Sequence, residues 1–284
     1  MARRPVVAVL SGRNDLDGHV IAAINALGMD CVWTCLQDMA INLESESTVV
    51  VPGMNGALPD YALVLKLGMT STNQLTHRLG LLQLLASLGV RTMNWADAIE
   101  LCGNKGRTSA MLDLGNVPTP KVWVTEDREL ASDIVNLETA AGTKLVQKLI
   151  SGSHGSGIEL VEAGTELREV TYLQRFLPGA YSGDIRVLVA GGKAIAAMKR
   201  NGEGWVNSAT RGAKLEAYPV DSDEGELAVF AADVLALDIA GVDICGGMVL
   251  EVNSVPGWDG LQSVTNESIP AMIVKALATD GVLV

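Results

Sequence analysis

The sequence lacks several features that define large classes of proteins. Its 284 residues contain no run of 18 or more uncharged apolar residues, so no transmembrane helix is expected. The N-terminal segment has two arginines but only a short apolar run, which does not fit a signal peptide. Acidic residues outnumber basic ones by 33 to 21, for a formal net charge of −12, and this argues against broad nucleic-acid binding.

Cysteine and histidine are scarce and scattered. Only three histidines accompany the four cysteines, and no spacing matches a zinc finger. No serine–histidine–aspartate or cysteine–histidine set is placed for covalent catalysis. Reduced, buried thiols in a cytoplasmic protein are therefore expected for Cys31, Cys35, Cys102 and Cys245.

Apolar strand-like runs and helical patterns alternate along the chain, which predicts an α/β fold with further α+β parts. Residues 1–94 are expected to form a domain with a parallel sheet, because the strand near 6–10 shows no polar alternation. Residues 95–177 and 178–284 are expected to form two more domains. Since there is neither an internal repeat nor a low-complexity linker, the three domains should pack closely.

Local signals place individual elements. One helix should end at Gly89, another should contain Asn104 and Lys105, and a third should run from 223 to 240. The pair Gly191-Gly192 should form the tight turn of a β-hairpin. A last helix should begin near Pro270, since proline is tolerated in the first helical turn.

A glycine-rich segment follows the strand that ends near Lys148 and precedes another strand, so it should form a flap over phosphates. Glycines let backbone N–H groups approach an anion, the serines add hydroxyl donors, and Lys148 adds a point charge. The spacing matches neither a Walker A motif nor the Rossmann fingerprint, and an ordinary glycine-rich turn is the alternative. Within the flap, His154 either contacts phosphate or is merely exposed. The flap residues are Gly152, Ser153, His154, Gly155, Ser156 and Gly157.

A polar pair interrupts an apolar strand in the stretch MVLEVNSVPG near the C-terminus. Glu251 and Asn253 are two residues apart and therefore project from the same face of the strand. Asp243 lies in the preceding apolar strand, and a turn at Gly246-Gly247 would bring it near Glu251. Buried carboxylates are costly unless paired, and hard oxygen donors suit Mg²⁺ together with phosphate oxygens. The alternative is that each acid pairs with a structural arginine or lysine.

Six stretches, taken in this order, resemble the ATP-grasp ligases, and more narrowly the RimK family of carboxylate–amine ligases. They are NKGRTSAML, KLISGSHGSGIEL, LQRFLPGAYSGDIRVLV, WVNSATRGA, LALDIAGVDI and MVLEVNSVPGWDGL. The resemblance implies an ATP-grasp fold of three domains, in which two α+β domains enclose ATP. It also implies an enzyme that adds an amino acid, often glutamate, to an acceptor, and that self-associates as a dimer or tetramer.

The resemblance implies roles for residues at the matching positions. Lys105 and Lys148 would hold the ATP phosphates, and Asp184 would bind the ribose. Arg211 would steady phosphate oxygens or the acyl phosphate, and Arg186 would face the reacting carboxylate. An adenine hinge would comprise Gln174, Arg175, Phe176 and Leu177, and two Mg²⁺ ions, replaceable by Mn²⁺, would bind Asp243, Glu251 and Asn253.

Two positions depart from the family pattern. The hinge of the family often has glutamine followed by glutamate, whereas here Arg175 follows Gln174, which would shift nucleotide binding toward backbone carbonyls. The loop before the arginine–glycine pair carries its asparagine one place early. A substrate role for Asn207 and Ser208 therefore stays open.

The expected reaction joins a carboxylate to an amine. The carboxylate attacks the γ-phosphate of ATP, giving an acyl phosphate and ADP, and the amine then displaces phosphate. The acceptor would be an amine- or carboxylate-bearing small-molecule cofactor, peptide or protein. The alternatives are an ATP-grasp ligase acting on a peptide or D-amino acid, and a catalytically inert ATP-binding regulatory protein. Acceptor contacts are expected at Arg13, Lys66, Arg200 and Trp258, with solvated surface charge as the alternative for the basic residues.

Overall fold

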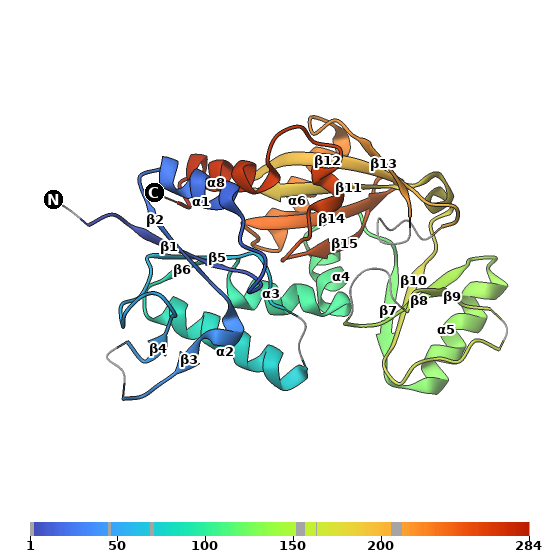
Figure 1. The fold of residues 1–284 in the computed structure, drawn as a ribbon. Helices are drawn as coiled ribbons and strands as arrows, with labels where there is room; N and C mark the ends of the chain where they lie inside the picture. The colour runs from blue at the N-terminus through green and yellow to red at the C-terminus, as the bar shows by residue number, and fades with distance from the viewer. Residues whose placement is uncertain are drawn as a thin grey trace.

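The computed structural model describes residues 3–44, 47–68, 71–151, 157–162, 164–205 and 212–283. Across these ranges the strands form sheets of four, four and five strands and one two-stranded sheet. Figure 1 shows the N-terminal sheet at the left, the strands between residues 122 and 175 at the right, and the C-terminal sheet at the top between them. No helix in the described ranges is long and apolar enough to cross a membrane.

The N-terminal group contains a parallel sheet, as the sequence predicted. Its strand order is β2-β1-β5-β6, and each pairing is parallel. β1 is buried along nearly its whole length, which explains its lack of polar alternation. α2 ends just before Gly89, whose φ of 90° fits the predicted helix end. The elements are β1 (Val6–Leu10), α1 (Gly18–Ala26), β2 (Asp30–Thr34), η1 (Leu36–Asp38), β3 (Ala40–Ile41), β4 (Val49–Val50), β5 (Tyr61–Val64), α2 (Thr72–Ser87) and β6 (Arg91–Met93).

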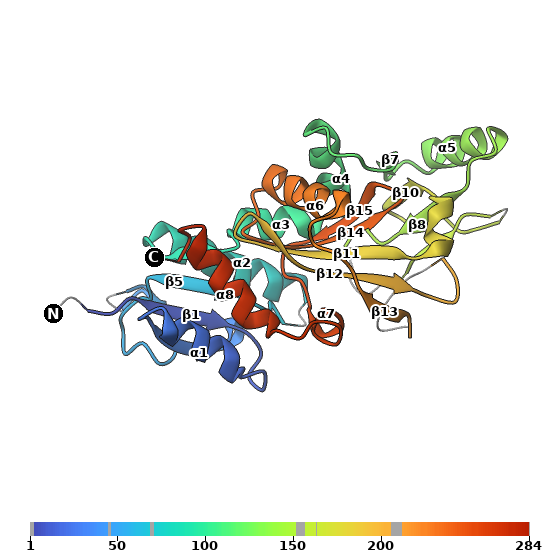
Figure 2. The same cartoon turned by 90° about the horizontal axis from the view of Figure 1, so that it is seen from above.

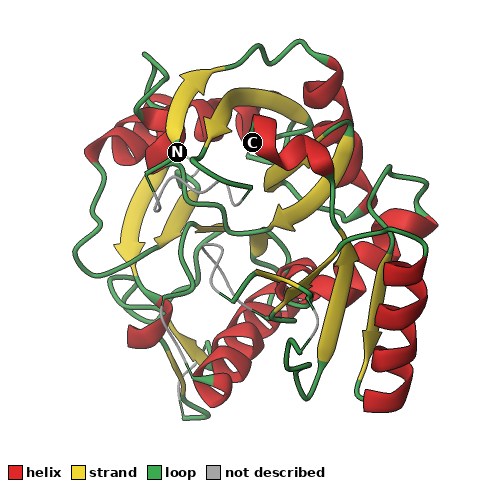
Figure 3. Cartoon of the chain, turned by 90° about the vertical axis from the view of Figure 1, so that its right-hand side faces the viewer, coloured by secondary structure: helices red, strands yellow, loops and turns green. Residues whose placement is uncertain are grey.

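The middle group contains an antiparallel sheet in the order β7-β10-β8-β9. The helix α5 packs against β7 and β8, and Figure 3 shows the group from its own side of the molecule. β8 and β9 pair in antiparallel fashion on either side of the glycine-rich segment, as predicted. The elements are α3 (Ala96–Gly103), α4 (Lys105–Leu114), β7 (Val122–Thr125), α5 (Arg128–Ala140), β8 (Leu145–Lys148), β9 (Glu159–Leu160) and β10 (Thr171–Arg175).

The C-terminal group contains a five-stranded antiparallel sheet in the order β13-β12-β11-β14-β15. The predicted hairpin between β11 and β12 is confirmed, and both of its turn residues, Gly191 and Gly192, have positive φ. The elements are η2 (Pro178–Ser182), β11 (Asp184–Ala190), β12 (Lys193–Asn201), β13 (Lys214–Ala217), α6 (Asp223–Val234), β14 (Ile239–Cys245), β15 (Met248–Asn253), α7 (Asp259–Gln262) and α8 (Ile269–Thr279).

A shared core connects the N-terminal and C-terminal groups. α8 lies against α1 on one side and against β11 and β12 on the other (Figure 2). Its buried Ile273 and Leu277 belong to one apolar cluster that also contains Val9 of β1 and Leu188 of β11. A second cluster packs α6 against the same five-stranded sheet. The sheet is therefore covered by helices, while the domain boundaries at 94 and 177 stay predictions.

Two helix predictions were wrong in detail. The single helix expected around Asn104 is two helices, because Asn104 is extended and its side chain accepts a hydrogen bond from the Arg107 N–H as the N-cap of α4. The helix expected to reach residue 240 ends at Val234. There the chain turns through Ala236, with φ of 53°, and from Ile239 onward it becomes a fully buried strand.

Candidate active site

The hairpin of β14 and β15 brings together the three oxygen-bearing side chains that the sequence singled out. Asp243 lies directly opposite Glu251 in the ladder, and Asn253 lies opposite Gly241. The turn is formed by Gly246 and Gly247, as predicted. The ladder is irregular just after Asp243, which fits the tendency of β-bulges to lie beside functional sites.

Asp243 is held by two arginines, one from the adjacent strand β11 and one from β12 beyond it. Arg186, its partner across the β11–β14 ladder, donates from Nε and Nη2 to the two carboxylate oxygens at 2.7 and 2.9 Å. Arg200 of β12 lies 3.1 Å from Asp243 Oδ2. Burial opposes the charged form of Asp243, but the two guanidinium groups outweigh it and lower its pKa.

Arg200 also holds Asp184, which lies opposite it in the β11–β12 ladder. The Nε of Arg200 donates to Asp184 Oδ1 at 2.6 Å, and both side chains are buried. Burial raises the pKa of Asp184, and Arg200 offsets this only in part. One buried guanidinium therefore connects the acid expected at the ribose with an acid expected at the metal.

Two lysines from the middle group complete the cluster. Lys105 is the first residue of α4, and its Nζ lies 3.2 Å from Glu251 Oε1. Its backbone N–H donates to Ile150 O, which ties the start of α4 to the segment after β8. Lys148, the last residue of β8, is buried, and that burial lowers its pKa against the opposing influence of Glu251.

The local charge of this cluster opposes the charge of the whole chain. Four cationic side chains face three carboxylates, in a protein whose formal net charge is −12. A site with a surplus of positive charge favours an anionic ligand. The members are Lys105, Lys148, Asp184, Arg186, Arg200, Asp243 and Glu251.

The donor set fits Mg²⁺ bound together with an anion. Asp243 and Glu251 do form ion pairs, which was the alternative to a metal site. A carboxylate offers about four lone-pair sites, however, so an acid in an ion pair can still bind a metal ion. Asn253 contributes a carboxamide oxygen from the same strand face as Glu251. Within the described residues no group of three or more histidine, cysteine or acidic side chains is arranged for a metal. Phosphate oxygens would therefore have to complete the coordination.

A buried hydrogen-bonded network, which sequence reasoning missed, lies beside the two lysines. Tyr172 lies opposite Lys148 in the β8–β10 ladder, and its hydroxyl is 3.0 Å from Ser109 Oγ and 3.4 Å from Gln174 Nε2. Burial raises the pKa of Tyr172 to about 12. The only local signal was a tyrosine placed two residues before a glutamine in an apolar strand.

The hinge segment is anchored through its side chains. Arg175 forms two hydrogen bonds of 2.8 Å with Glu138 of α5 and lies over the ring of Trp123. Its side chain is thus committed to α5. Phe176 makes edge-to-face contacts with Tyr181 and Trp205, at ring-centroid distances of 5.5 and 5.6 Å. The N–H groups of Arg175 and Phe176 donate to backbone carbonyls, and Leu177 O accepts from the Ala180 N–H.

The basic residues expected to contact the acceptor lie in ion pairs. Arg13 pairs with Asp38, which also accepts a hydrogen bond from the Cys35 thiol, and Lys66 Nζ lies 2.7 Å from Asp15. Arg13 lowers the pKa of Asp38 to about 2. Both basic residues follow neighbouring parallel strands, β1 and β5, and so lie at one edge of the sheet.

Two further predicted site residues, Trp258 and Gly157, lie within the described ranges. Trp258 is half-buried against the core that contains α8. Gly157, at the end of the flap, has φ of 66°. Eight predicted residues lie outside the described residues: Gly152, Ser153, His154, Gly155, Ser156, Asn207, Ser208 and Arg211.

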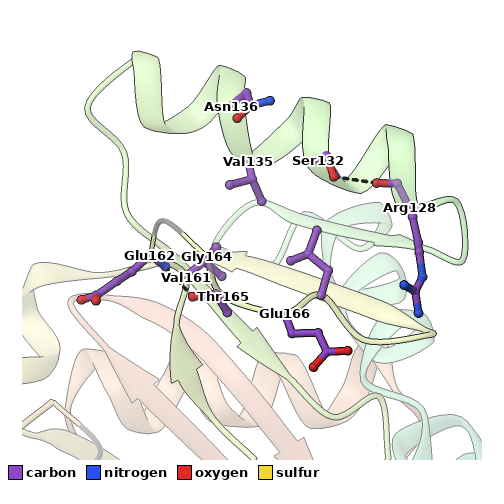
Figure 4. Close-up of a pocket in the computed structure, with 10 residues that line it drawn as sticks. Arg128, Ser132, Val135, Asn136, Val161, Glu162, Gly164, Thr165 and Glu166 are labelled. Atoms are coloured by element: carbon purple, nitrogen blue, oxygen red, sulfur yellow. Dashed lines mark hydrogen bonds between the residues drawn. The ribbon is translucent and has the colours of Figure 1, made fainter.

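A cavity of about 350 Å³ lies elsewhere, between α5 and the segment that follows β9. Figure 4 shows Arg128, Ser132 and Asn136 on the helix above Glu162 and Glu166. None of the charged residues of the cluster lines this cavity, so it is separate from the candidate active site.

The order of the sheets and the cluster between the middle and C-terminal groups fit the class of nucleotide-dependent ligases called ATP-grasp enzymes. A family model described as the RimK-like ATP-grasp domain matches residues 102–277. The chain belongs to the RimK-like ATP-grasp family, and it is accordingly an enzyme that forms C–N bonds.

Known proteins resemble this chain in sequence or in fold. The chain is 30% identical over 244 residues to the "probable alpha-L-glutamate ligase 2" of Hahella chejuensis (strain KCTC 2396), covering 80% of this chain and 79% of the relative. The ATP-grasp ligase PsnB, solved with a minimal precursor, has a similar fold with a TM-score of 0.75 at 19% identity, over 99% and 100% of the two chains. Another PsnB structure, solved with minimal precursor, Mg and ADP, has a TM-score of 0.71 at 20% identity, over 99% of each chain.

Proposed function

We propose that this protein is an ATP-dependent carboxylate–amine ligase that adds an amino acid, with glutamate as the first candidate, to an acceptor that ends in a carboxylate. The products would be an amide, ADP and phosphate. The single observation that carries this proposal is the positively charged cluster around the facing pair Asp243 and Glu251. The names of the curated relatives favour glutamate.

The cluster supports a specific placement of the nucleotide. Lys105 and Lys148 would bind its phosphates, Asp184 its ribose, and the backbone of Gln174 to Leu177 its adenine. Arg175 would contribute no side-chain contact, because its guanidinium is bonded to Glu138. The flap from Gly152 to Gly157 would cover the phosphates.

Asp243, Glu251 and Asn253 would hold Mg²⁺, with two ions as the expected number. The metal would neutralise charge on the phosphate oxygens, which is its usual contribution to phosphoryl transfer. Arg186 and Arg200 fix the orientation of Asp243 through three contacts of 3.1 Å or less. Such support around a ligand commonly tunes its affinity for the metal.

Bringing a carboxylate to a phosphate joins two anions, so the residues around them must offset the repulsion. The lysines, Arg186 and Arg211 would do this, since preorganised positive groups are most effective where water is excluded. The acyl phosphate is prone to hydrolysis, and closure of the flap would protect it. The amine of the second substrate would then attack the acyl carbon, and phosphate would leave. No covalent intermediate with the protein is required.

Product analysis tests this proposal. The protein is incubated with ATP, Mg²⁺, glutamate and a panel of carboxylate acceptors, including free glutamate, glutamyl peptides and carboxylate-bearing cofactors. We expect ADP, phosphate and an acceptor heavier by one or more amino-acid residues. Release of AMP and pyrophosphate would indicate adenylation and overturn the mechanism. Binding of ATP without turnover across the panel would favour an inert regulatory protein.

A further inference from the structure

One carboxamide closes the open end of the hairpin that carries the three oxygen donors. Asn94, in the segment between β6 and α3, is almost fully buried. Its Oδ1 accepts from the Ile239 N–H at 2.9 Å, and its Nδ2 donates to Ile239 O and Ser254 O, each at 2.6 Å. Only this orientation of the amide matches donors with acceptors, so the assignment of its oxygen and nitrogen is determined.

The bonded atoms lie at the two strand ends opposite the turn. Ile239 is the first residue of β14, and Ser254 directly follows the last residue of β15. The ladder between these strands ends at the pair Gly241 and Asn253. Asn94 therefore bonds Ile239 as the peptide group of a neighbouring strand would, at the point where β15 no longer reaches it.

An ion pair strengthens the same junction. Arg91 of β6 lies 2.6 Å from Asp238, the residue just before β14, and its guanidinium lies 4.3 Å from the ring centre of Trp95. Two side chains from one short segment of the N-terminal group thus hold the open end of the hairpin. We call Asn94 and the Arg91–Asp238 pair the hairpin clamp.

The strand ends that the clamp holds lie close in sequence to each proposed metal donor. Asn253 directly precedes Ser254, Glu251 lies two residues earlier, and Asp243 lies four residues after Ile239. A shift of one strand end would move Glu251 and Asn253 relative to Asp243. Reactions that depend on fixed geometry lose much of their rate when groups are displaced by about 1 Å.

We propose that Asn94 is a positioning residue that fixes the relative placement of Asp243, Glu251 and Asn253, and so sets the affinity for Mg²⁺ in the nucleotide complex. This inference rests on the proposed function, in which these three side chains bind the metal. Asn94 does not itself contact the metal or the substrates. It acts through the backbone of the hairpin, and it makes the site depend on the N-terminal group.

The test measures ADP affinity by calorimetry, with saturating Mg²⁺ and separately with EDTA. In Asn94→Ala and Asn94→Asp we expect the Kd for ADP with Mg²⁺ to rise about tenfold, the usual scale for loss of a group that orients metal ligands. The Kd in EDTA should stay within about twofold of the original protein. A general destabilisation of the fold would instead weaken ADP binding both with Mg²⁺ and in EDTA.

Gln262 provides a matched control. Its carboxamide makes the same three kinds of bond, accepting from the Ile269 N–H at 2.9 Å and donating to Thr265 O and Glu267 O at 3.2 and 2.9 Å. It is the last residue of α7, outside the hairpin. The variant Gln262→Ala should lower the temperature of unfolding, yet leave the effect of Mg²⁺ on ADP affinity unchanged.

The outcomes separate the clamp from the proposed function. If Glu251→Gln leaves the effect of Mg²⁺ unchanged, the proposed metal site is wrong. If Glu251→Gln abolishes that effect while both folded Asn94 variants retain it, only the role of the clamp is overturned. Should the Asn94 variants not fold, Arg91→Met, which removes the partly exposed half of the clamp, must weaken the Mg²⁺-dependent affinity selectively. Unchanged affinity in that variant would also overturn the clamp.

Discussion

Arg200 donates to Asp184 at 2.6 Å across the β11–β12 ladder. The same guanidinium also lies 3.1 Å from Asp243. Because the Arg200–Asp184 pair is buried, removing the arginine should leave the Asp184 carboxylate buried without its cation. We expect Arg200→Met to lower the free energy of unfolding by about 3–5 kcal/mol, the usual cost of breaking a buried pair. Urea unfolding measures this.

The control for that prediction removes both partners. In the double variant Asp184→Asn with Arg200→Met, the isolated charge at residue 184 is gone, so part of the lost stability should return. A double variant that is less stable than Arg200→Met alone would show that the pair does not account for the effect.

The buried ammonium of Lys148 should lower the free energy of unfolding, although the proposed function requires it. Burial lowers its pKa below the ordinary value of 10.5, so between the folded and unfolded pKa values the unfolded chain binds more protons. The free energy of unfolding should therefore rise with pH through this window. We expect Lys148→Met to be more stable than the original protein at pH 7, with a gap that narrows toward pH 10.5, and to lose turnover.

Thermal unfolding at several pH values checks the Lys148 prediction. The exposed Lys275 of α8 offers a matched change, since Lys275→Met should alter stability little and without a comparable dependence on pH. Equal pH profiles for the two variants would contradict a buried ammonium at residue 148.

The hydroxyl of Tyr172 should stabilise the protein through Ser109. We expect Tyr172→Phe and Ser109→Ala each to lower the free energy of unfolding, with a coupling of about 1 kcal/mol in a double-mutant cycle. The reason is that either change removes the 3.0 Å contact between the two buried hydroxyls, and after Ser109→Ala the Tyr172 hydroxyl keeps only the longer, 3.4 Å contact with Gln174. Additive effects of the two changes would show that the 3.0 Å contact contributes no stability.

The closeness of Asp243 and Glu251 could be predicted from the sequence because the signals were local: an apolar run identified each strand, and the Gly246-Gly247 turn joined them. Their exact opposition could not, since regular pairing from this turn would place Leu250 opposite Asp243, and the irregularity after Asp243 shifts the register by one residue. The end of α6 was harder to predict from the sequence. Residues 235–240 are mostly apolar, and this pattern fits both a continued helix and a buried strand.

The contacts of Arg186, Arg200 and Asn94 could not be predicted in the same way. Arg186 and Arg200 meet Asp243 because β14 pairs with β11, and no local pattern specifies that strand order. Asn94 bonds residues 145 and 160 positions away. Contacts of this kind depend on how the groups of the fold pack together, and a single sequence does not display that packing.

The most direct test of the proposed phosphoryl-transfer site compares the original protein with Glu251→Gln under hydroxylamine, which traps acyl phosphates as hydroxamates. With ATP, Mg²⁺ and a carboxylate acceptor, the original protein should form hydroxamate and ADP in equal amounts. Glu251→Gln, with an unfolding temperature close to the original, should form both at least about 100-fold more slowly, the scale seen when one preorganised electrostatic group is lost. A folded Glu251→Gln variant with full activity would contradict the assignment of Asp243, Glu251 and Asn253 to the reacting centre.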